Sequence, residues 1–220
     1  MRKLLLFLCI TPLYFSCFAQ KPQQLVVLDT SMFDKYFQTI SLSAKNGWLF
    51  KPGNDTSWAK SQIDTTGWIK LNPAALTAKN ADKAGKLEGW FRISFMLDRS
   101  FKNIRIGIQA LRWAAVDIYV DGNYITSFGN TGYDGKPYQE NRNAGMVIRP
   151  LSIETGKTHI LAVHIVDRVA PLNHRFLKTE SLSNNLSSFI SITGPLAYEK
   201  FTRYSREDNG YGFLDRKSVE

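Results

Sequence analysis

The sequence predicts an all-β protein built as an antiparallel β-sandwich, and three observations lead to this prediction. The stretch GWFRISFML (89–97) alternates between two sets of side chains, which indicates a strand with one face in a core. Similar short runs recur at regular spacing, with turn residues such as Asp121-Gly122 between them. No run is followed by an amphipathic helix, which argues against a parallel α/β sheet.

The first segment, residues 1–19, predicts a cleaved signal peptide. Two basic residues precede a short apolar run, and Ala19 provides the small residue expected at the cut. A membrane anchor and a lipoprotein cut before Cys17 are the alternatives; Pro12 and the shortness of the run favour a cleaved signal. We therefore expect an exported protein, in the periplasm or at the cell surface.

Composition narrows the choice of partners. The chain has 220 residues, 44% hydrophobic and 21% charged, which is a globular composition. Both cysteines, Cys9 and Cys17, lie in the leader, so the mature chain has no disulfide and no cysteine-based metal site. Removal of Arg2 and Lys3 lowers the net charge from +9 to +7. This balance suits acidic glycans or an anionic membrane surface, although scattered basic residues also make an ordinary solvated surface; nucleic acid is not an expected partner.

The first half of the mature chain contains a lead-in and three expected strands. Residues 20–40 form the lead-in, in which MFDKYFQTISL (32–42) predicts a short amphipathic helix followed by a strand. A strand before Pro52-Gly53, a loop with one helical turn and a short strand at 67–71 come next. The strand at 89–97 completes this half.

The second half predicts most of the sheet. Its expected strands and loops, in order, are 103–111, the hairpin 114–129, a long polar loop at 129–145, strands at 146–153 and 158–167, a second long loop at 168–188, and a last strand at 189–198. The sandwich domain spans residues 41–200, and a charged tail fills 201–220. The predicted core comprises Phe91, Ile93, Phe95, Ile106, Ile108, Ile118 and Val163.

Signatures of catalysis, metal binding and cofactor binding are absent from the sequence. No Gly-x-Ser-x-Gly elbow occurs. His159, His164 and His174 do not make a metal set, because the first two fall on opposite faces of one strand. Asp117 is the one acidic residue near the middle of a sheet, whereas a glycosidase needs two facing carboxylates, with Glu88 as the conceivable second. We therefore predict no enzyme activity, no cofactor and no metal.

The outward set of side chains on the strands suggests a binding face. Aromatic rings stack on sugars, and planar polar groups bond hydroxyls. The alternative is that outer faces of antiparallel sheets are polar in any case, and that Trp90 covers the sheet beneath the N-terminal segment. The residues assigned to this face are Trp90, Arg92, Ser94, Arg105, Gln109, Asp117, Tyr119 and His164.

Two further places complete the predicted site. Arg112 and Trp113 interrupt the alternation between two strands, at a sheet edge or loop, where Trp113 is either a contact residue or a plug. His174 and Arg175 lie in the second long loop. The predicted ligand-binding residues are Trp90, Arg92, Arg112, Trp113, His174 and Arg175.

Three segments carry a resemblance to known domains: GWLFKPGNDTSWAKSQIDTTGWIKL, GWFRISFML and AVDIYVDGNYITSFGN. Together they resemble the galactose-binding-like jelly roll. The chain is similar to the sugar-binding domain of the β-galactosidase family, with the pattern Asp64 to Trp68, then Trp90-Phe91-Arg92, then a YVDG hairpin. It also looks like the exported N-terminal domain of Bacteroidetes sensor histidine kinases, over residues 40–200.

The resemblance implies a ligand-sensing or carbohydrate-binding domain without catalysis of its own. The implied role is signal input to a membrane-bound histidine kinase of a two-component system, with a small molecule or glycan as ligand. The alternatives are a secreted carbohydrate-binding accessory module and a fragment of a glycoside hydrolase. Sensor receptors continue into membrane helices and a kinase, and the present sequence stops before either.

Overall fold

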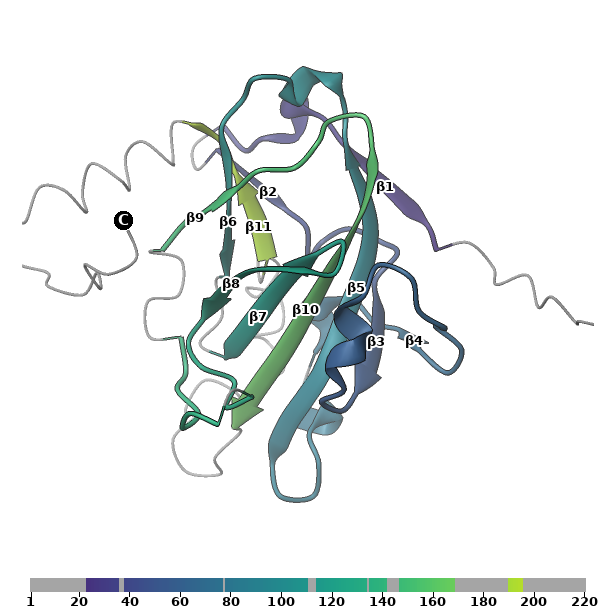
Figure 1. Cartoon of the computed structure of the whole chain (residues 1–220), viewed down its shortest axis with the longest axis vertical. Coiled ribbons are helices and arrows are strands. Elements are labelled where there is room, and N and C mark those ends of the chain that lie inside the picture. The colour runs from purple at the N-terminus through teal and green to yellow at the C-terminus, as the bar shows by residue number, and fades with distance from the viewer. Residues whose placement is uncertain are drawn as a thin grey trace, which may run out of the picture.

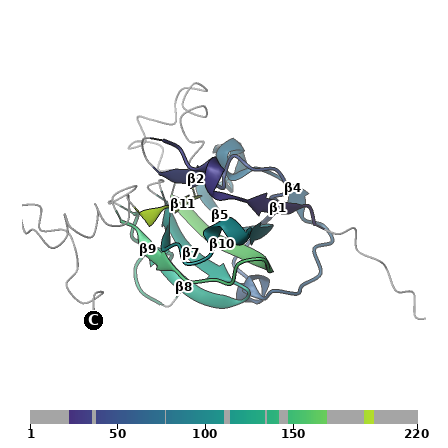
Figure 2. The same cartoon turned by 90° about the horizontal axis from the view of Figure 1, so that it is seen from above.

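The computed structural model describes residues 23–35, 38–76, 78–110, 114–133, 135–141, 147–168 and 190–195. Their strands form two sheets that face each other (Figure 1, Figure 2). The larger sheet contains β1 (Leu25–Leu28), β3 (Leu49–Pro52), β4 (Ile69–Lys70), β5 (Lys86–Leu97), β7 (Ala115–Val120), β8 (Asn123–Phe128) and β10 (Thr158–Arg168). The smaller sheet contains β2 (Thr39–Ser41), β6 (Ile106–Ala110), β9 (Arg149–Leu151) and β11 (Ile190–Thr193).

The order of the strands is that of a jelly roll. The larger sheet runs β4-β3-β5-β10-β7-β8, with β1 also paired to β5, and the smaller one runs β2-β11-β6-β9. From β5 onward the chain passes from sheet to sheet, except at the β7–β8 hairpin, so strands distant in sequence become neighbours. Every pairing is antiparallel except that of β1 with β5. The predicted all-β jelly-roll sandwich is confirmed.

The core lies between the two sheets and is filled by alternate residues of the strands. All seven residues predicted for it are buried, with Ile106 the most exposed at 7%. Phe91 packs against Phe50 at 4.6 Å and edge-on against Trp48 at 6.0 Å between ring centroids, which fills the wide part of the core. Period-two alternation therefore identified the buried face correctly.

The β7–β8 hairpin turns at Asp121-Gly122, as predicted. Both residues have positive φ, 53° and 84°, which matches the right-handed twist of the flanking strands. Asp121 tolerates this conformation because its carboxylate accepts a hydrogen bond from the Ile160 backbone N–H and contacts the ring of buried His159. The turn is thereby fixed to β10.

Short 3₁₀ helices connect the strands. They are η1 (Thr30–Met32), η2 (Thr56–Ala59), η3 (Pro73–Ala75), η4 (Ala78–Asn80) and η5 (Arg99–Phe101). Asp55 begins η2 by accepting a hydrogen bond from the Ser57 N–H, the usual role of a carboxylate at an N-cap. This is the one helical turn predicted for that loop. No helix among the described residues has the length and apolarity needed to cross a membrane.

Two expectations are corrected. The described residues of 32–42 form no amphipathic α-helix, and the lead-in instead contributes β1 and most of β2 to the sheets. Arg105 and Gln109 do not share a face with Trp90, because Gln109 lies on β6 of the smaller sheet and Arg105 immediately precedes that strand. Alternation fixes which residues share a side of one strand, but not which sheet the strand joins.

Candidate functional site

Outward-facing residues of four neighbouring strands line up in a row across the larger sheet. His164 on β10 is paired with Trp90 on β5 and, on its other side, with Asp117 on β7. Asp117 is in turn paired with Ser127 on β8. Because directly opposed residues have their Cβ atoms about 4.5–5.5 Å apart, the register alone brings these side chains together.

Five rings form a continuous series of contacts on this face. We call Tyr124, Tyr119, Trp90, His164 and Tyr133 the aromatic arc. Successive centroids are 5.6, 5.5, 4.8 and 6.5 Å apart, and the Trp90 and His164 rings stack at an interplanar angle of 19°. Such packing restricts each ring to one orientation, so the arc is a rigid platform.

Exposure differs sharply along the aromatic arc. Trp90 and His164 in its middle are 0% and 1% exposed, whereas Tyr124 and Tyr133 at its ends are 57% and 55% exposed. They are the only exposed aromatic side chains among the described residues. The buried rings therefore support two tyrosines that are exposed to solvent.

Asp117 provides a carboxylate between the two exposed tyrosines. Ser127 Oγ donates to Asp117 Oδ1 at 2.6 Å, and Thr131 Oγ1 donates to Oδ2 at 2.7 Å. Burial of the carboxyl raises its pKa, but hydrogen bonds from His164, Ser127 and Thr131 outweigh burial, so the pKa lies below its ordinary value. Asp117 is consequently held as an anion.

His164 lies between two carboxylates. Its Nδ1 is 3.4 Å from Asp117 Oδ2, and its Nε2 is 3.5 Å from Glu88 Oε1. Nε2 makes no hydrogen bond despite being buried, and the other Glu88 oxygen accepts from Lys86 Nζ at 2.6 Å. The structure therefore brings Asp117 and Glu88, the two acidic residues considered in the sequence, to opposite sides of one imidazole.

The segment after β8 carries Tyr133 and is held in a fixed path. Asn130 and Gln139 exchange backbone hydrogen bonds of 2.7 and 2.9 Å. Gly129, at a φ of 74°, leaves room for this closure, because a Cβ there would lie 2.4 Å from the Gln139 carbonyl oxygen. Tyr133 Oη donates to Thr56 Oγ1 at 3.0 Å and so connects the segment to η2.

The second tyrosine is fixed from β7 and β8. Tyr124 Oη lies 2.6 Å from Ser127 Oγ, which itself donates to Asp117. Tyr119 beneath it is half-buried; burial first, and then the charge of Asp117, raises its pKa to about 12. Tyr119 therefore keeps its proton and stays neutral at physiological pH.

The predicted contact residues Trp90 and Arg92 are covered by the loop around η2. Trp90 packs in a cluster with Ala59, Trp68 and Ala162, and the Trp90 Nε1 has no hydrogen-bond partner. Arg92 is 2% exposed, and its two terminal nitrogens donate to the carbonyl oxygens of Trp58 and Ser61 at 2.5 and 2.9 Å. Burial lowers the Arg92 pKa to about 10.

The expectation that this pair lies on an accessible face is therefore corrected. Trp90 covers the sheet, as the alternative held, and among the described residues the η2 loop packs over it. Arg92 fixes that loop by bonding its backbone. Arg112, Trp113, His174 and Arg175 lie outside the described residues, and their part in binding stays a prediction.

Sequence reasoning missed the two exposed tyrosines. Tyr124 lies on β8, just after the hairpin turn. A bulge between Tyr124 and Ser127 lets both side chains face outward, so simple alternation does not predict that Tyr124 shares this face. Tyr133 lies in the long polar loop predicted at 129–145, and its aromatic side chain was the available signal. No group of three or more metal-binding side chains occurs in the part of the chain that the structure describes.

Comparison with known proteins gives a partial likeness to solved structures. No protein-family profile matches the chain, and no curated protein sequence matches it. The solved structures that it resembles include β-glucuronidase 2 of Bacteroides uniformis, 17% identical with a TM-score of 0.49, over 71% of this chain and 18% of that one.

Two other solved structures give similar values. A glycosyl hydrolase family 2 member from Bacteroides cellulosilyticus is 16% identical with a TM-score of 0.48, over 71% of this chain and 20% of that one. A β-glucuronidase from an uncultured Clostridium is 18% identical with a TM-score of 0.37, over 60% and 23%. The chain spans about a fifth of the length of these enzymes, and likeness at this level assigns neither a family nor an activity.

Proposed function

We propose that this chain is an exported carbohydrate-binding module, without catalysis of its own, that binds a sugar on the aromatic arc. The observation that carries the proposal is that the only exposed aromatic side chains of the described residues, Tyr124 and Tyr133, end one series of ring contacts around the Asp117 carboxylate. Exposed rings next to directional polar groups suit a sugar, whose ring has apolar faces and polar edges.

The polar atoms of the site suit a neutral, hydroxyl-rich ligand. A carboxylate has about four acceptor positions, and Asp117 uses three of them for Ser127, Thr131 and His164. The remaining position accepts a hydrogen bond from a ligand hydroxyl. The site is held in place before binding, which reduces the ordering cost of association.

The state of Asp117 argues against the role of general acid in a glycosidase. A general acid in glycoside hydrolysis needs a raised pKa so that it is protonated near neutral pH. The pKa of Asp117 is lowered by its hydrogen bonds, which keeps it ionised. Asp117 is accordingly suited to accept hydrogen bonds and unsuited to donate a proton.

A glycan array with the wild type, followed by titration calorimetry, tests the proposal. Replacing Tyr124 or Tyr133 with Ala weakens binding about tenfold or more per ring, as for bases stacked on aromatic side chains. Ile69→Ala is the matched control, because Ile69 is 51% exposed on β4 and is absent from the arc. A blank array, or equal affinity in the tyrosine variants and the control, contradicts the proposal.

Export is part of the proposal and rests on the leader-like residues 1–19. Cleavage after Ala19 leaves Gln20 at the mature N-terminus. Mass spectrometry of the periplasmic protein checks whether the mature chain begins at Gln20. A lipid-modified Cys17 or an uncut leader contradicts cleavage after Ala19.

The finer role that we propose is signal input to a sensor histidine kinase, which rests on the sequence resemblance over residues 40–200. The DNA that follows the codon for Glu220 discriminates it from the alternatives. A membrane helix and a kinase in the same reading frame support the sensor role. A catalytic barrel favours a glycoside hydrolase fragment, and a stop codon within a polysaccharide-utilisation locus favours an accessory module.

A further inference from the structure

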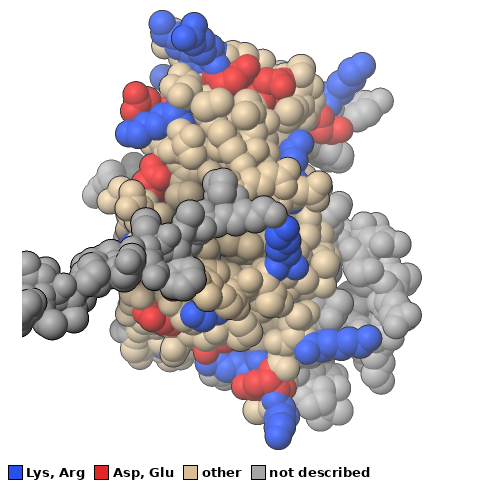
Figure 3. All heavy atoms as spheres, turned by 90° about the vertical axis from the view of Figure 1, so that its right-hand side faces the viewer, with Lys and Arg blue, Asp and Glu red and all other residues tan. Residues whose placement is uncertain are grey.

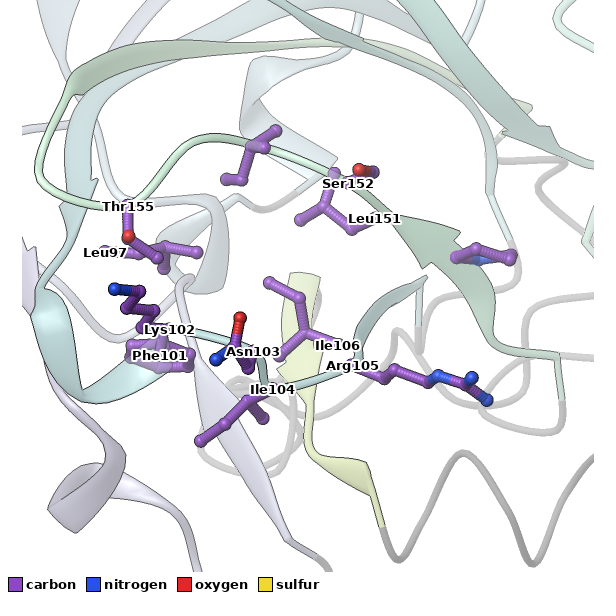
Figure 4. A pocket seen from close by; sticks show the side chains of 12 residues that line it. Leu97, Phe101, Lys102, Asn103, Ile104, Arg105, Ile106, Leu151, Ser152 and Thr155 are labelled. Carbon is purple, nitrogen blue, oxygen red and sulfur yellow. The ribbon is translucent and has the colours of Figure 1, made fainter.

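A cavity of about 500 Å³ opens between the sheets near the end of β5, where Leu97 lies in its lining (Figure 4). Most of its lining comes from the connection between β5 and β6 together with the first residue of β6 (101–106), and from the end of β9 together with the connection that follows it (150–155). None of the five residues of the aromatic arc contributes to it. The volume falls within the roughly 300–1,000 Å³ of small-molecule sites.

The floor of the cavity is the end of the hydrophobic core. Leu97, Phe101, Ile106 and Leu151 are at most 7% exposed and belong to the main core cluster. The side chains of Ile106 and Leu151 point toward one another across the space in Figure 4. An apolar group that enters here extends the core and leaves water, which favours its binding.

The rim carries positive charge without compensation. Lys102 and Arg105 are exposed, and neither forms an ion pair with a described residue. The lining contains no Asp or Glu. The acidic side chain between two lining residues, Glu154, pairs with Lys157 at 3.5 Å instead. An anion at either end of this rim therefore meets one cation, and the described lining adds no carboxylate.

The two basic side chains of the lining lie at opposite ends of the cavity. Lys102 lies at the same end as the Thr155 hydroxyl in Figure 4, and Arg105 lies at the other end. Asn103 has a positive φ of 65°, and the Gly156 N–H donates to the Leu97 carbonyl oxygen at 2.7 Å, which joins the two connections. The lining is thus elongated, with one cation at each end.

We propose that this cavity binds a medium-chain organic carboxylate, with the carboxylate at Lys102 and the acyl chain along the apolar floor. A single ammonium beside the Thr155 hydroxyl suits a singly charged head group. The apolar side chains of the floor suit a flexible aliphatic chain, whereas the polar side chains of the lining suit the carboxylate. The site is separate from the aromatic arc and does not rest on the proposed sugar-binding function.

Titration calorimetry of the full chain with decanoate tests the site, with decanol as the uncharged analogue of equal chain length and butanoate as the short acid. Decanoate binds saturably, and decanol and butanoate bind about tenfold or more weakly, because each lacks one half of the recognition. Lys102→Gln weakens decanoate binding about tenfold, and Arg105→Gln weakens it less.

Two control variants show whether decanoate binds in this cavity or elsewhere on the protein. Lys70→Gln removes an equal charge from an exposed residue of β4 outside the lining and leaves decanoate binding unchanged. Tyr124→Ala also leaves decanoate binding unchanged, so failure of the sugar site and failure of this site are told apart. No saturable binding of decanoate, equal binding of decanol, or equal loss in Lys102→Gln and Lys70→Gln overturns the proposal.

Discussion

The outer face of the larger sheet has two regions of similar chemistry and opposite exposure. Around Trp90 and Arg92, an aromatic and a cationic side chain are closed off by the loop that contains η2. Around Tyr124 and Tyr133, aromatic side chains beside a carboxylate stay open to solvent. Trp90 takes part in both regions, since its ring contacts Tyr119 and His164 of the arc.

The two regions differ in what they contribute to the protein. The buried region contributes stability, because Trp90 is fully removed from water and Arg92 satisfies two backbone carbonyls. The open region contributes contact surface and little stability. On this sheet, residue type therefore does not distinguish a side chain that stabilises the fold from one that can contact a ligand. What distinguishes them is whether a neighbouring loop covers the side chain.

The side of the molecule seen in Figure 3, toward β1 and β4, has another character. Most Lys, Arg, Asp and Glu side chains lie toward the upper and lower ends of this view, and uncharged surface separates them where no grey atoms cover it (Figure 3). Exposed apolar residues of these strands, Leu25, Val27 and Ile69, agree with this view. They are aliphatic and carry no neighbouring polar network such as that of Asp117, so this face lacks the features of the arc.

The largest expected effect comes from the shared residue. Trp90→Ala removes a fully buried ring from beneath the η2 loop and lowers the free energy of unfolding by about 3–5 kcal/mol. Urea unfolding followed by circular dichroism measures it, with Tyr124→Ala as the exposed aromatic control. A loss below about 1 kcal/mol would place Trp90 with the contact residues.

A smaller effect is expected at Arg92. Arg92→Met keeps an unbranched apolar stem but leaves the carbonyl oxygens of Trp58 and Ser61 without donors, at a cost of about 2 kcal/mol. The released loop exposes the bond after Lys60 to trypsin, so limited proteolysis gives a local measure. Unchanged cleavage after Lys60 would mean that Arg92 does not fix the loop.

At Asp117 the effect depends on pH. Its pKa is lowered in the folded protein, so its contribution to stability is complete above about pH 4 and is lost as pH falls through the folded-state value. Asp117→Asn removes this contribution, so the stability of the variant falls less between pH 5 and about pH 2–3 than that of the wild type. Parallel stability–pH curves for the two proteins would contradict the role given to Asp117.

The smallest effect on stability belongs to the exposed tyrosines. Tyr124→Ala changes the free energy of unfolding by about 0.5 kcal/mol or less, because the ring is more than half exposed. Tyr133→Ala costs slightly more, since its hydroxyl bonds Thr56 of the distant η2 turn, whereas the Tyr124 hydroxyl bonds Ser127 of its own strand. Thermal melts check both values, and a loss comparable to that of Trp90→Ala would remove the distinction between the two regions.

Local sequence patterns predicted the strands and the core because those patterns depend only on neighbouring residues. The alternation in 89–97 placed Phe91, Ile93 and Phe95 inside, and Asp121-Gly122 placed the hairpin. The same reasoning placed His159 and His164 on opposite faces of β10, where one contacts Asp121 and the other Asp117. Period and turn chemistry are properties of a few consecutive residues.

The candidate site depended on contacts that no local pattern contains. Arg105 and Gln109 alternate as the outward residues of β5 do, yet β6 joins the other sheet. Trp90 and Arg92 faced outward as expected, but the η2 loop, some thirty residues earlier in the chain, covers them. Part of the face that was predicted to be polar and outward is therefore buried in a second, smaller hydrophobic cluster.

By itself the sequence determined the fold class, the inward residues and the hairpin, because hydrophobic period and turn geometry act over short distances along the chain. Only the tertiary structure decided that His164 lies between Asp117 and Glu88, and that Tyr124 and Tyr133 end one arc. The physical reason is that pairing of β5, β10, β7 and β8 joins segments far apart in sequence. Strand register and loop cover, which follow from that pairing, determine which side chains meet and which reach solvent.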